Sequence, residues 1–170
     1  MSTTIHYFGK VKSQDSIREL QEEFREICQV SGWDHEVVDE VFTQPGEAGL
    51  TSLTLNGIRI KLGKNTPPLQ LTFDKDGYLS HIFMESVPVG FPVRGSGKSV
   101  TTPKTQIMHQ VHTSTSLRSG EVQTHITLIK LLDYLKKRYV PNLEVIDNTG
   151  YWYSRDESVL APKKLELAKK

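Results

Sequence analysis

Two amphipathic segments near opposite ends of the chain constrain its fold more than any other feature. Between residues 16 and 31, and again between 121 and 139, apolar residues recur every three or four positions, as on one face of an α-helix. Gly32 and Pro141 follow as terminators. The predicted inward residues are Ile17, Leu20, Phe24, Ile27, Cys28, Val122, His125, Ile126, Ile129, Leu132 and Leu135.

The rest of the ordered sequence predicts β-strands, because apolar and polar residues alternate in short runs. Asn56-Gly57 is either a two-residue hairpin turn or a bulge within one long strand. Asp74-Lys75-Asp76-Gly77 is typical of a turn between two strands of a hairpin. The predicted strands cover residues 5–11, 37–42, 53–62, 69–73, 79–83, 104–116 and 143–146.

This order, β-α-β-β-β-β-β-α-β, predicts an α+β fold in which a curved antiparallel sheet packs on the two helices. A length of 170 residues suits a single domain, which we expect to span 1–161. Proline, glycine and hydroxyl residues predict a mobile loop at about 88–102, and 162–170 is expected to be a frayed tail.

The formal net charge of +1 hides an asymmetry between the two halves. Residues 1–85 carry a net charge of −5 and residues 86–170 a net charge of +6. The basic region 94–138 could attract a nucleotide or nucleic acid. Alternatively, the halves pack together and their charges cancel, which we favour because the isoelectric point is only 7.9.

Several classes of protein are excluded by simple features. The chain has no apolar run of the length that a membrane helix needs, and residues 1–7 do not resemble a secretory signal. With one cysteine, Cys28, it cannot form an intramolecular disulfide. We therefore expect a cytoplasmic protein that does not bind membranes.

Gly95-Ser96-Gly97-Lys98-Ser99 partly matches a phosphate-binding loop. However, Pro92 occupies the position of the first glycine, and the residues after Ser99 do not begin a helix. We therefore interpret this segment as a flexible loop, with a weak anion contact at Lys98 and Arg94 as the alternative.

Three histidines, His109, His112 and His125, are the only candidates for a metal site. On a strand, His109 and His112 would point to opposite faces. His125 lies on the apolar side of the second predicted helix, where a hydrogen-bonded core histidine is the simpler interpretation. We therefore expect no metal and no cofactor.

The aromatic run Tyr151-Trp152-Tyr153, with Arg155, is the most prominent surface candidate. Read as an extended segment, it places the tyrosines on one side and Trp152 on the other. These residue types are common at protein interfaces and at base-stacking platforms. We favour burial of Trp152 against the second helix, with the tyrosines as a rim.

Several short motifs occur in roughly the C-terminal third: Lys104-Thr105-Gln106, Gly120-Glu121, His125, Leu131-Leu132, Tyr134-Leu135, the run 141–145, Asp147 and Tyr151-Trp152. Together they resemble a group of small bacterial α+β proteins that have no assigned activity. The resemblance implies a bacterial origin and a cytoplasmic setting, but no site.

No catalytic set of residues can be assigned, since Cys28 lies on the inward helical face and no nucleophile motif occurs. The leading hypothesis is therefore a non-enzymatic module that binds a protein or a small ligand. The alternatives are a nucleotide or nucleic-acid binder that uses residues 94–138, and a small enzyme with a site around His109, His112 or His125.

Overall fold

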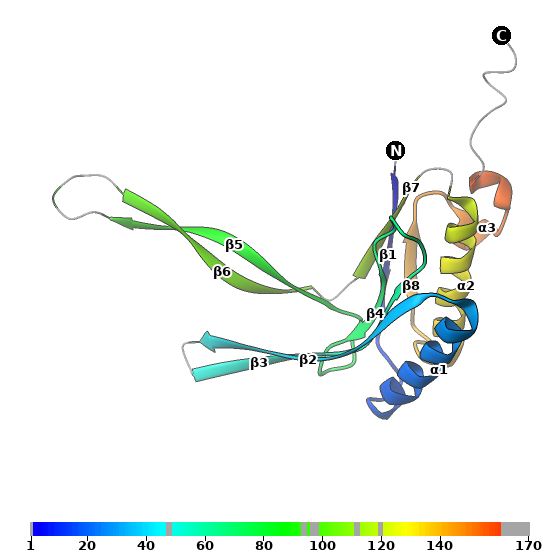
Figure 1. Cartoon of the computed structure of the whole chain (residues 1–170), viewed down its shortest axis with the longest axis horizontal. Helices are drawn as coiled ribbons and strands as arrows, with labels where there is room; N and C mark the ends of the chain where they lie inside the picture. Colours follow the sequence, from blue (N-terminus) through cyan, green and yellow to red (C-terminus); the bar gives the residue numbers. More distant parts are fainter. Residues whose placement is uncertain are drawn as a thin grey trace, which may run out of the picture.

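The computed structural model describes residues 2–46, 49–92, 95, 99–110, 113–118 and 121–160. The helices and strands confirm the predicted α+β class (Figure 1). Their order is β1 (Ser2–Phe8), α1 (Asp15–Ser31), β2 (Asp34–Gly46), β3 (Gly49–Lys61), β4 (Leu69–Phe73), β5 (His81–Pro92), β6 (Ser99–Gln110), β7 (Thr113–Arg118), α2 (Val122–Arg138), β8 (Glu144–Asp147), α3 (Tyr151–Ser154) and the 3-10 helix η1 (Glu157–Leu160).

Helices α1 and α2 form where the apolar periodicity predicts them. Gly32 ends α1 in the left-handed conformation, with φ 74°, which glycine adopts without steric cost. The inward faces of both helices share one apolar core with residues of β1, β3, β4, β7 and β8. Both helices lie on the same side of the strands (Figure 1).

The strands form three antiparallel ladders, β7-β1-β8, β2-β3-β4 and β5-β6, so the prediction of one curved sheet is wrong in this respect. The reason lies at the edge of β4. The Tyr7 hydroxyl donates to the Gln70 carbonyl and accepts from the Gln70 N–H, both at 2.9 Å. Because a side chain satisfies these backbone groups, no neighbouring strand is needed there.

Asn56-Gly57 is neither a hairpin turn nor a bulge. Strand β3 runs through it without a shift in register, both against β2 and against β4. At Gly57 the backbone of β4 comes very close, since a Cβ there would lie 1.9 Å from the Leu71 carbonyl oxygen. The glycine is therefore required by a close approach of two strands.

The turn at Asp74–Gly77 forms as predicted, but the hairpin that should follow it is short. The Asp74 N–H donates to the Tyr78 carbonyl, and Phe73 faces Leu79 in a single bridge. The chain then leaves β4, and β5 pairs with β6 along its whole length. The length of the hairpin depends on which strand β5 pairs with, and the alternation of apolar and polar residues does not specify that partner.

The expected loop at 88–102 is also corrected, because residues 88–92 belong to β5 and 99–102 to β6. Pro88 and Pro103 lie opposite each other in the ladder. Proline is tolerated in a two-stranded ribbon where the missing N–H would face away from the partner strand. Lys98, Arg94, His112 and the tail 162–170 lie outside the described residues.

Two hairpins project from the side of the molecule opposite the helices (Figure 1). We call residues 34–61 the β2–β3 arm and residues 81–110 the β5–β6 arm. Within the described residues, β5 and β6 pair only with each other. In the same part of the chain, no helix combines the length and the apolar character needed to cross a bilayer.

Candidate interaction surface

The aromatic run at the C-terminal end does not form an extended surface patch. Tyr151 and Trp152 are buried in the short helix α3, whereas Tyr153 is 77% exposed. The Arg155 guanidinium lies 4.7 Å from the centre of the Trp152 ring and forms an ion pair with Asp133. Trp152 is therefore a covered structural side chain, as the favoured interpretation predicts, and is not available for base stacking. The same interpretation predicts both tyrosines at the rim, which is wrong for Tyr151 because this side chain is buried.

His125 is a hydrogen-bonded core histidine. Its Nε2 lies 3.0 Å from Oδ2 of Asp147, which is buried with it. Asp147 also accepts from the backbone N–H and hydroxyl of Thr149 and from the Trp152 N–H. These bonds close the turn that starts α3 as a helix, which explains why 151–153 is not extended.

The pKa of the Asp147 carboxyl is lowered by this environment. Burial alone would raise the pKa, but the hydrogen bonds from His125 and Thr149 outweigh it. The arrangement joins α2 to β8 and α3, and both side chains of the pair are buried. We therefore assign this histidine and carboxylate pair a structural role.

His109 lies on β6, far along the chain from its partner. Its Nε2 lies 3.3 Å from Oδ2 of Asp74, in the turn after β4. The Ser80 hydroxyl donates to the same carboxylate oxygen at 3.0 Å. The pair thus ties the root of the β5–β6 arm to the body. Across the described ranges, no three histidine, cysteine or acidic side chains are grouped as metal ligands.

The basic end of α2 is paired with acidic residues of α1. Arg138 lies 3.1 Å from Glu19 and 3.0 Å from Glu23. Burial and a hydrogen bond to Glu23 raise the pKa of the neighbouring Tyr139 to about 12. The positive charge of Arg138, in the second half of the chain, is therefore balanced by carboxylates of the first half. This agrees with the prediction that the charges of the two halves cancel where they pack together.

The feature that sequence reasoning missed is one face of the β2–β3 arm. Directly opposed residues of an antiparallel ladder share a face, so the register places nine described side chains together. We call this set the inner face. It comprises Asp34, Glu36, Val38, Glu40 and Phe42 on β2, and Leu53, Leu55, Arg59 and Lys61 on β3.

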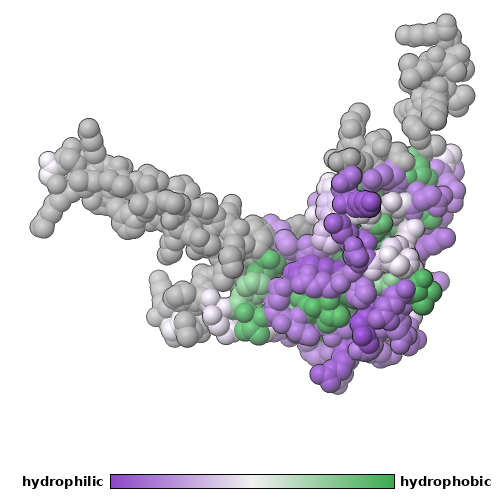
Figure 2. All heavy atoms as spheres, in the orientation of Figure 1, coloured by the Kyte–Doolittle hydropathy of each residue, from purple (hydrophilic) through white to green (hydrophobic). Residues whose placement is uncertain are grey.

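The middle of the inner face is apolar and separate from the main core. Val38 and Leu55 are buried there with Ile82 of β5, and Phe42 and Leu53 pack against them half-buried. Figure 2 shows apolar surface in green where the two arms leave the body. Toward their tips the arms diverge, so this small cluster marks the place where they meet (Figure 1).

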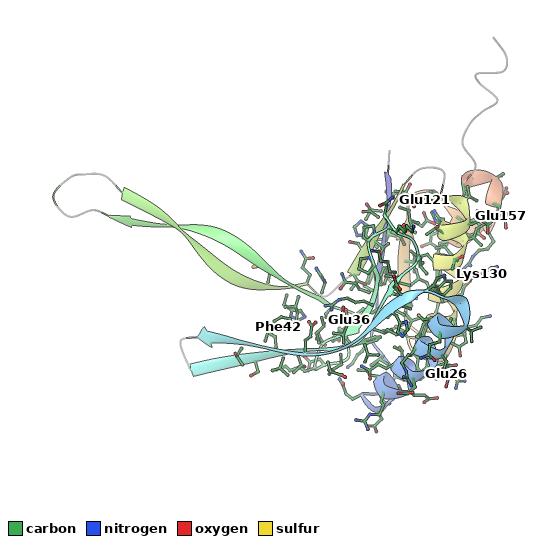
Figure 3. The ribbon with its side chains drawn as sticks, viewed as in Figure 1. Glu26, Glu36, Phe42, Glu121, Lys130 and Glu157 are labelled. Atoms are coloured by element: carbon green, nitrogen blue, oxygen red, sulfur yellow. The ribbon has the colours of Figure 1, made fainter. Side chains whose placement is uncertain are left out.

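The root of the inner face is charged. Arg59 lies 3.1 Å from Glu40 and 3.8 Å from Glu36. The Arg59 side chain is 20% exposed and that of Glu36 is 65% exposed, and Asp34 and Lys61 are exposed beside them. Charges of both signs therefore face solvent at this root. In Figure 3, Glu36 lies near the root of the arm and Phe42 farther out.

A hollow of about 540 Å³ adjoins this charged root. Asp34 faces Lys61 directly across the ladder, as Glu36 faces Arg59, so the lining residues of opposite charge are already neighbours. We find no set of groups there that could act as nucleophile, acid and base together. The hollow is lined by Asp34, His35, Glu36, Arg59, Lys61, Lys64, Asn65, Thr66, Pro67 and Pro68.

Comparison of the chain with models of protein families, with curated proteins and with solved structures found no match. The candidate surface therefore rests on its own geometry. It offers exposed backbone edges, a half-buried apolar strip and exposed carboxylates, which together suit contact with another polypeptide.

Proposed function

We propose that the chain is a non-enzymatic protein-interaction module that holds a partner polypeptide between its two hairpin arms. The observation that carries this proposal is the apolar cluster of Val38, Leu55 and Ile82, extended outward by Phe42 and Leu53. Phe42 and Leu53 are only partly buried at the outer end of this cluster. A partner that covers both side chains would bury them fully.

The construction of the arms supports the same proposal. A two-stranded ribbon is only marginally stable in water on its own. Within the described residues, β2, β5 and β6 each pair on one side only and so have one free edge, and β3 pairs with β4 only over 56–60. Such edges pair readily with an added strand. The chain therefore carries two long ribbons that are weakly stable on their own. Binding of a partner polypeptide would stabilise them.

A polypeptide fits the surface better than a nucleic acid does. Phosphate backbones are bound by exposed lysine and arginine, whereas the cations of the inner face have acidic neighbours. Arg59 pairs with Glu36 and Glu40, and Lys61 lies opposite Asp34. Arg138, in the basic region of the sequence, is already paired with Glu19 and Glu23. The partner expected from these contacts is apolar where it meets Phe42 and basic where it meets Glu36.

The test uses two neighbouring positions on opposite faces of β2. Phe42 belongs to the inner face, whereas Val41 is 67% exposed and points the other way. In extracts of the cells that produce the chain, size exclusion with light scattering measures the mass of its complex. Phe42→Asp is expected to reduce that mass to the mass of the free chain, and Val41→Asp to leave it unchanged.

Thermal unfolding followed by circular dichroism controls for misfolding, and Leu53→Asp, directly opposite Phe42, provides a second inner-face variant. Equal masses for the Phe42 and Val41 variants, with both folded, would contradict the proposal. So would a wild-type chain that migrates alone in these extracts.

We also propose a reducing, cytoplasmic and bacterial setting for this interaction. The single cysteine, Cys28, is free and buried in α1. Burial raises the pKa of its thiol to about 11, which keeps it protonated and unreactive at neutral pH. The resemblance of the C-terminal third to small bacterial proteins supports the bacterial part of this proposal.

A further inference from the structure

We infer that the hollow at the root of the β2–β3 arm binds a small zwitterion, of the size of a free dipeptide, with one ammonium and one carboxylate group. This inference goes beyond the proposed function, because it adds a small-molecule site to a protein-interaction module. Three observations support it: the size of the hollow, a wall that is held in place, and two carboxylates that lie across from two ammonium groups.

The hollow is large enough for such a molecule, and a second hollow continues it. The first has a volume of about 540 Å³, within the range of ~300–1,000 Å³ that is usual for small-molecule sites. The second, of about 330 Å³, shares Asp34, Lys61 and Lys64 with it and is also lined by Trp33. Trp33 and Pro67-Pro68 provide apolar surface against which the side chains of a ligand can pack.

The wall formed by residues 62–68 is held in place without a ligand. Thr66 is buried, and its hydroxyl donates to a carboxylate oxygen of Glu121 at 3.4 Å. Near the end of this segment, the Pro68 carbonyl accepts from the Thr115 hydroxyl at 3.1 Å. Because the wall is already ordered, binding costs little conformational entropy there.

Two carboxylates and two ammonium groups line the first hollow, on different elements. Asp34 and Glu36 lie on β2. Lys61 is the last residue of β3, and Lys64 follows it before β4. All four residues are exposed. Within the described part of the chain, no ion pair or hydrogen bond engages the side chains of Asp34, Lys61 or Lys64, so these charges can meet a ligand.

The remaining cation of the hollow, Arg59, is already matched. It lies 3.1 Å from Glu40, whereas Glu36 is farther away, at 3.8 Å. A ligand therefore meets two positive and two negative charges, which sum to zero. The phosphates of a nucleotide would be repelled by the two carboxylates, whereas a zwitterion is attracted by both pairs.

The spacing of the charges suits a ligand with closely spaced ends. Asp34 is directly opposite Lys61 in the ladder, so the acidic and basic sides are about one strand spacing apart, ~4.8 Å. An extended peptide advances ~3.5 Å per residue, which gives the charged ends of a dipeptide a comparable separation. The ligand ammonium would lie toward β2, and its carboxylate toward Lys61 and Lys64.

A chemical-shift titration of the isotope-labelled full chain with leucyl-leucine tests this inference. The expected result is saturable shifts of amides in 33–36 and 61–66, with a dissociation constant of roughly 1 mM or below. N-acetyl-leucyl-leucine lacks the ammonium group and leucyl-leucinamide lacks the carboxylate. Each is expected to bind about tenfold or more weakly, because one pair of charges loses its counterpart.

Two matched pairs of variants assign the charges. Lys64→Gln should weaken the binding of leucyl-leucine about three- to tenfold. Lys130→Gln, on the exposed side of α2 and outside both hollows (Figure 3), should not. Asp34→Asn should weaken binding to a similar extent, with Glu26→Gln on α1 as its control. All four variants must retain the wild-type circular dichroism spectrum.

No shifts at about 10 mM leucyl-leucine, roughly tenfold above the expected constant, would overturn the inference, as would shifts confined to other residues. Tight binding of leucyl-leucinamide or of the N-acetyl form would also overturn it, since the site would then recognise one end of a longer polypeptide. Displacement of the dipeptide by adenosine monophosphate would show an anion site instead. None of these results bears on the dependence of the complex on Phe42, which tests the proposed function separately.

Discussion

Gly57 shows how a single residue permits the β2–β3–β4 ladder. It lies in the middle of β3, at a position where Cβ would be 1.9 Å from the Leu71 carbonyl oxygen and 2.8 Å from the Thr72 Cα. Both neighbours are backbone atoms, so no side-chain rotation can relieve the contact. Any larger residue must push β4 away from β3.

Gly57→Ala is therefore expected to destabilise the chain by roughly 3 kcal/mol, because the strands must separate to admit the methyl group. The measurement is urea unfolding followed by circular dichroism. Gly90→Ala is the control, since a Cβ at Gly90 meets nothing within 4 Å. An equal loss of stability in the two variants would show that the close approach at Gly57 is not rigid.

The carboxyl of Asp147 makes a second prediction at the same scale. Its pKa in the folded chain is below 3.8, the value without the fold. The ionised carboxylate therefore stabilises the fold above about pH 4, and this contribution is lost as pH falls through the folded pKa.

Asp147→Asn should cost about 1–3 kcal/mol at about pH 5, since the hydrogen bonds from His125 and Thr149 are weakened. The difference from wild type should shrink as pH falls toward about 2. Urea unfolding at both pH values measures it. A difference that stays constant or grows on acidification would mean that the ionised carboxylate does not stabilise this turn.

Among the elements, the β5–β6 arm depends most on a few contacts at its root. Ile82 packs with Val38 and Leu55, and His109 bonds to Asp74, which also receives hydrogen bonds from the backbone of Asp76 and Tyr78. These hydrogen bonds hold the Asp74 turn in one conformation, and the contact with His109 attaches β6 to this turn. We expect this contact to help position the arm.

His109→Ala is expected to raise the hydrogen-exchange rates of β5 and β6 amides about three- to tenfold, since one anchor of a marginally stable ribbon is lost. Exchange in α1 and α2 should not change. His35→Ala is the control, because His35 lies on the other hairpin and its ring is hydrogen-bonded to the nearby Trp33 carbonyl. Unchanged exchange in the arm would show that Ile82 alone positions it.

The helices could be predicted from sequence and the pairing of the strands could not. Periodicity places Ile17 to Cys28 on one face because helical contacts are local. Which strands pair depends on distant contacts, such as the Tyr7 hydroxyl on Gln70, and these leave no local pattern. Ser16 and Glu19 have the spacing of a capping box, yet α1 begins at Asp15 with no side-chain cap hydrogen bond.

At the scale of the whole molecule, the chain has one large apolar core in the body and a second, small apolar cluster where the two arms meet. The sequence made Tyr151 and Trp152 surface candidates because aromatic residues are common at interfaces. In the structure both side chains are buried. The inner face could not be predicted, because only the register of the β2–β3 ladder shows that Val38, Phe42, Leu53 and Leu55 lie together. Their alternation was the available signal, and it predicted a strand but not its exposure.

The most direct test of the interaction surface is site-specific photo-crosslinking in the cells that produce the chain. A photoreactive phenylalanine at position 42 is compared with the same residue at position 41, one step along β2 and on the opposite face. The proposed surface predicts a crosslink to one defined polypeptide from position 42, at roughly ten times the yield from position 41. Equal yields from the two positions, or none from position 42, would contradict it.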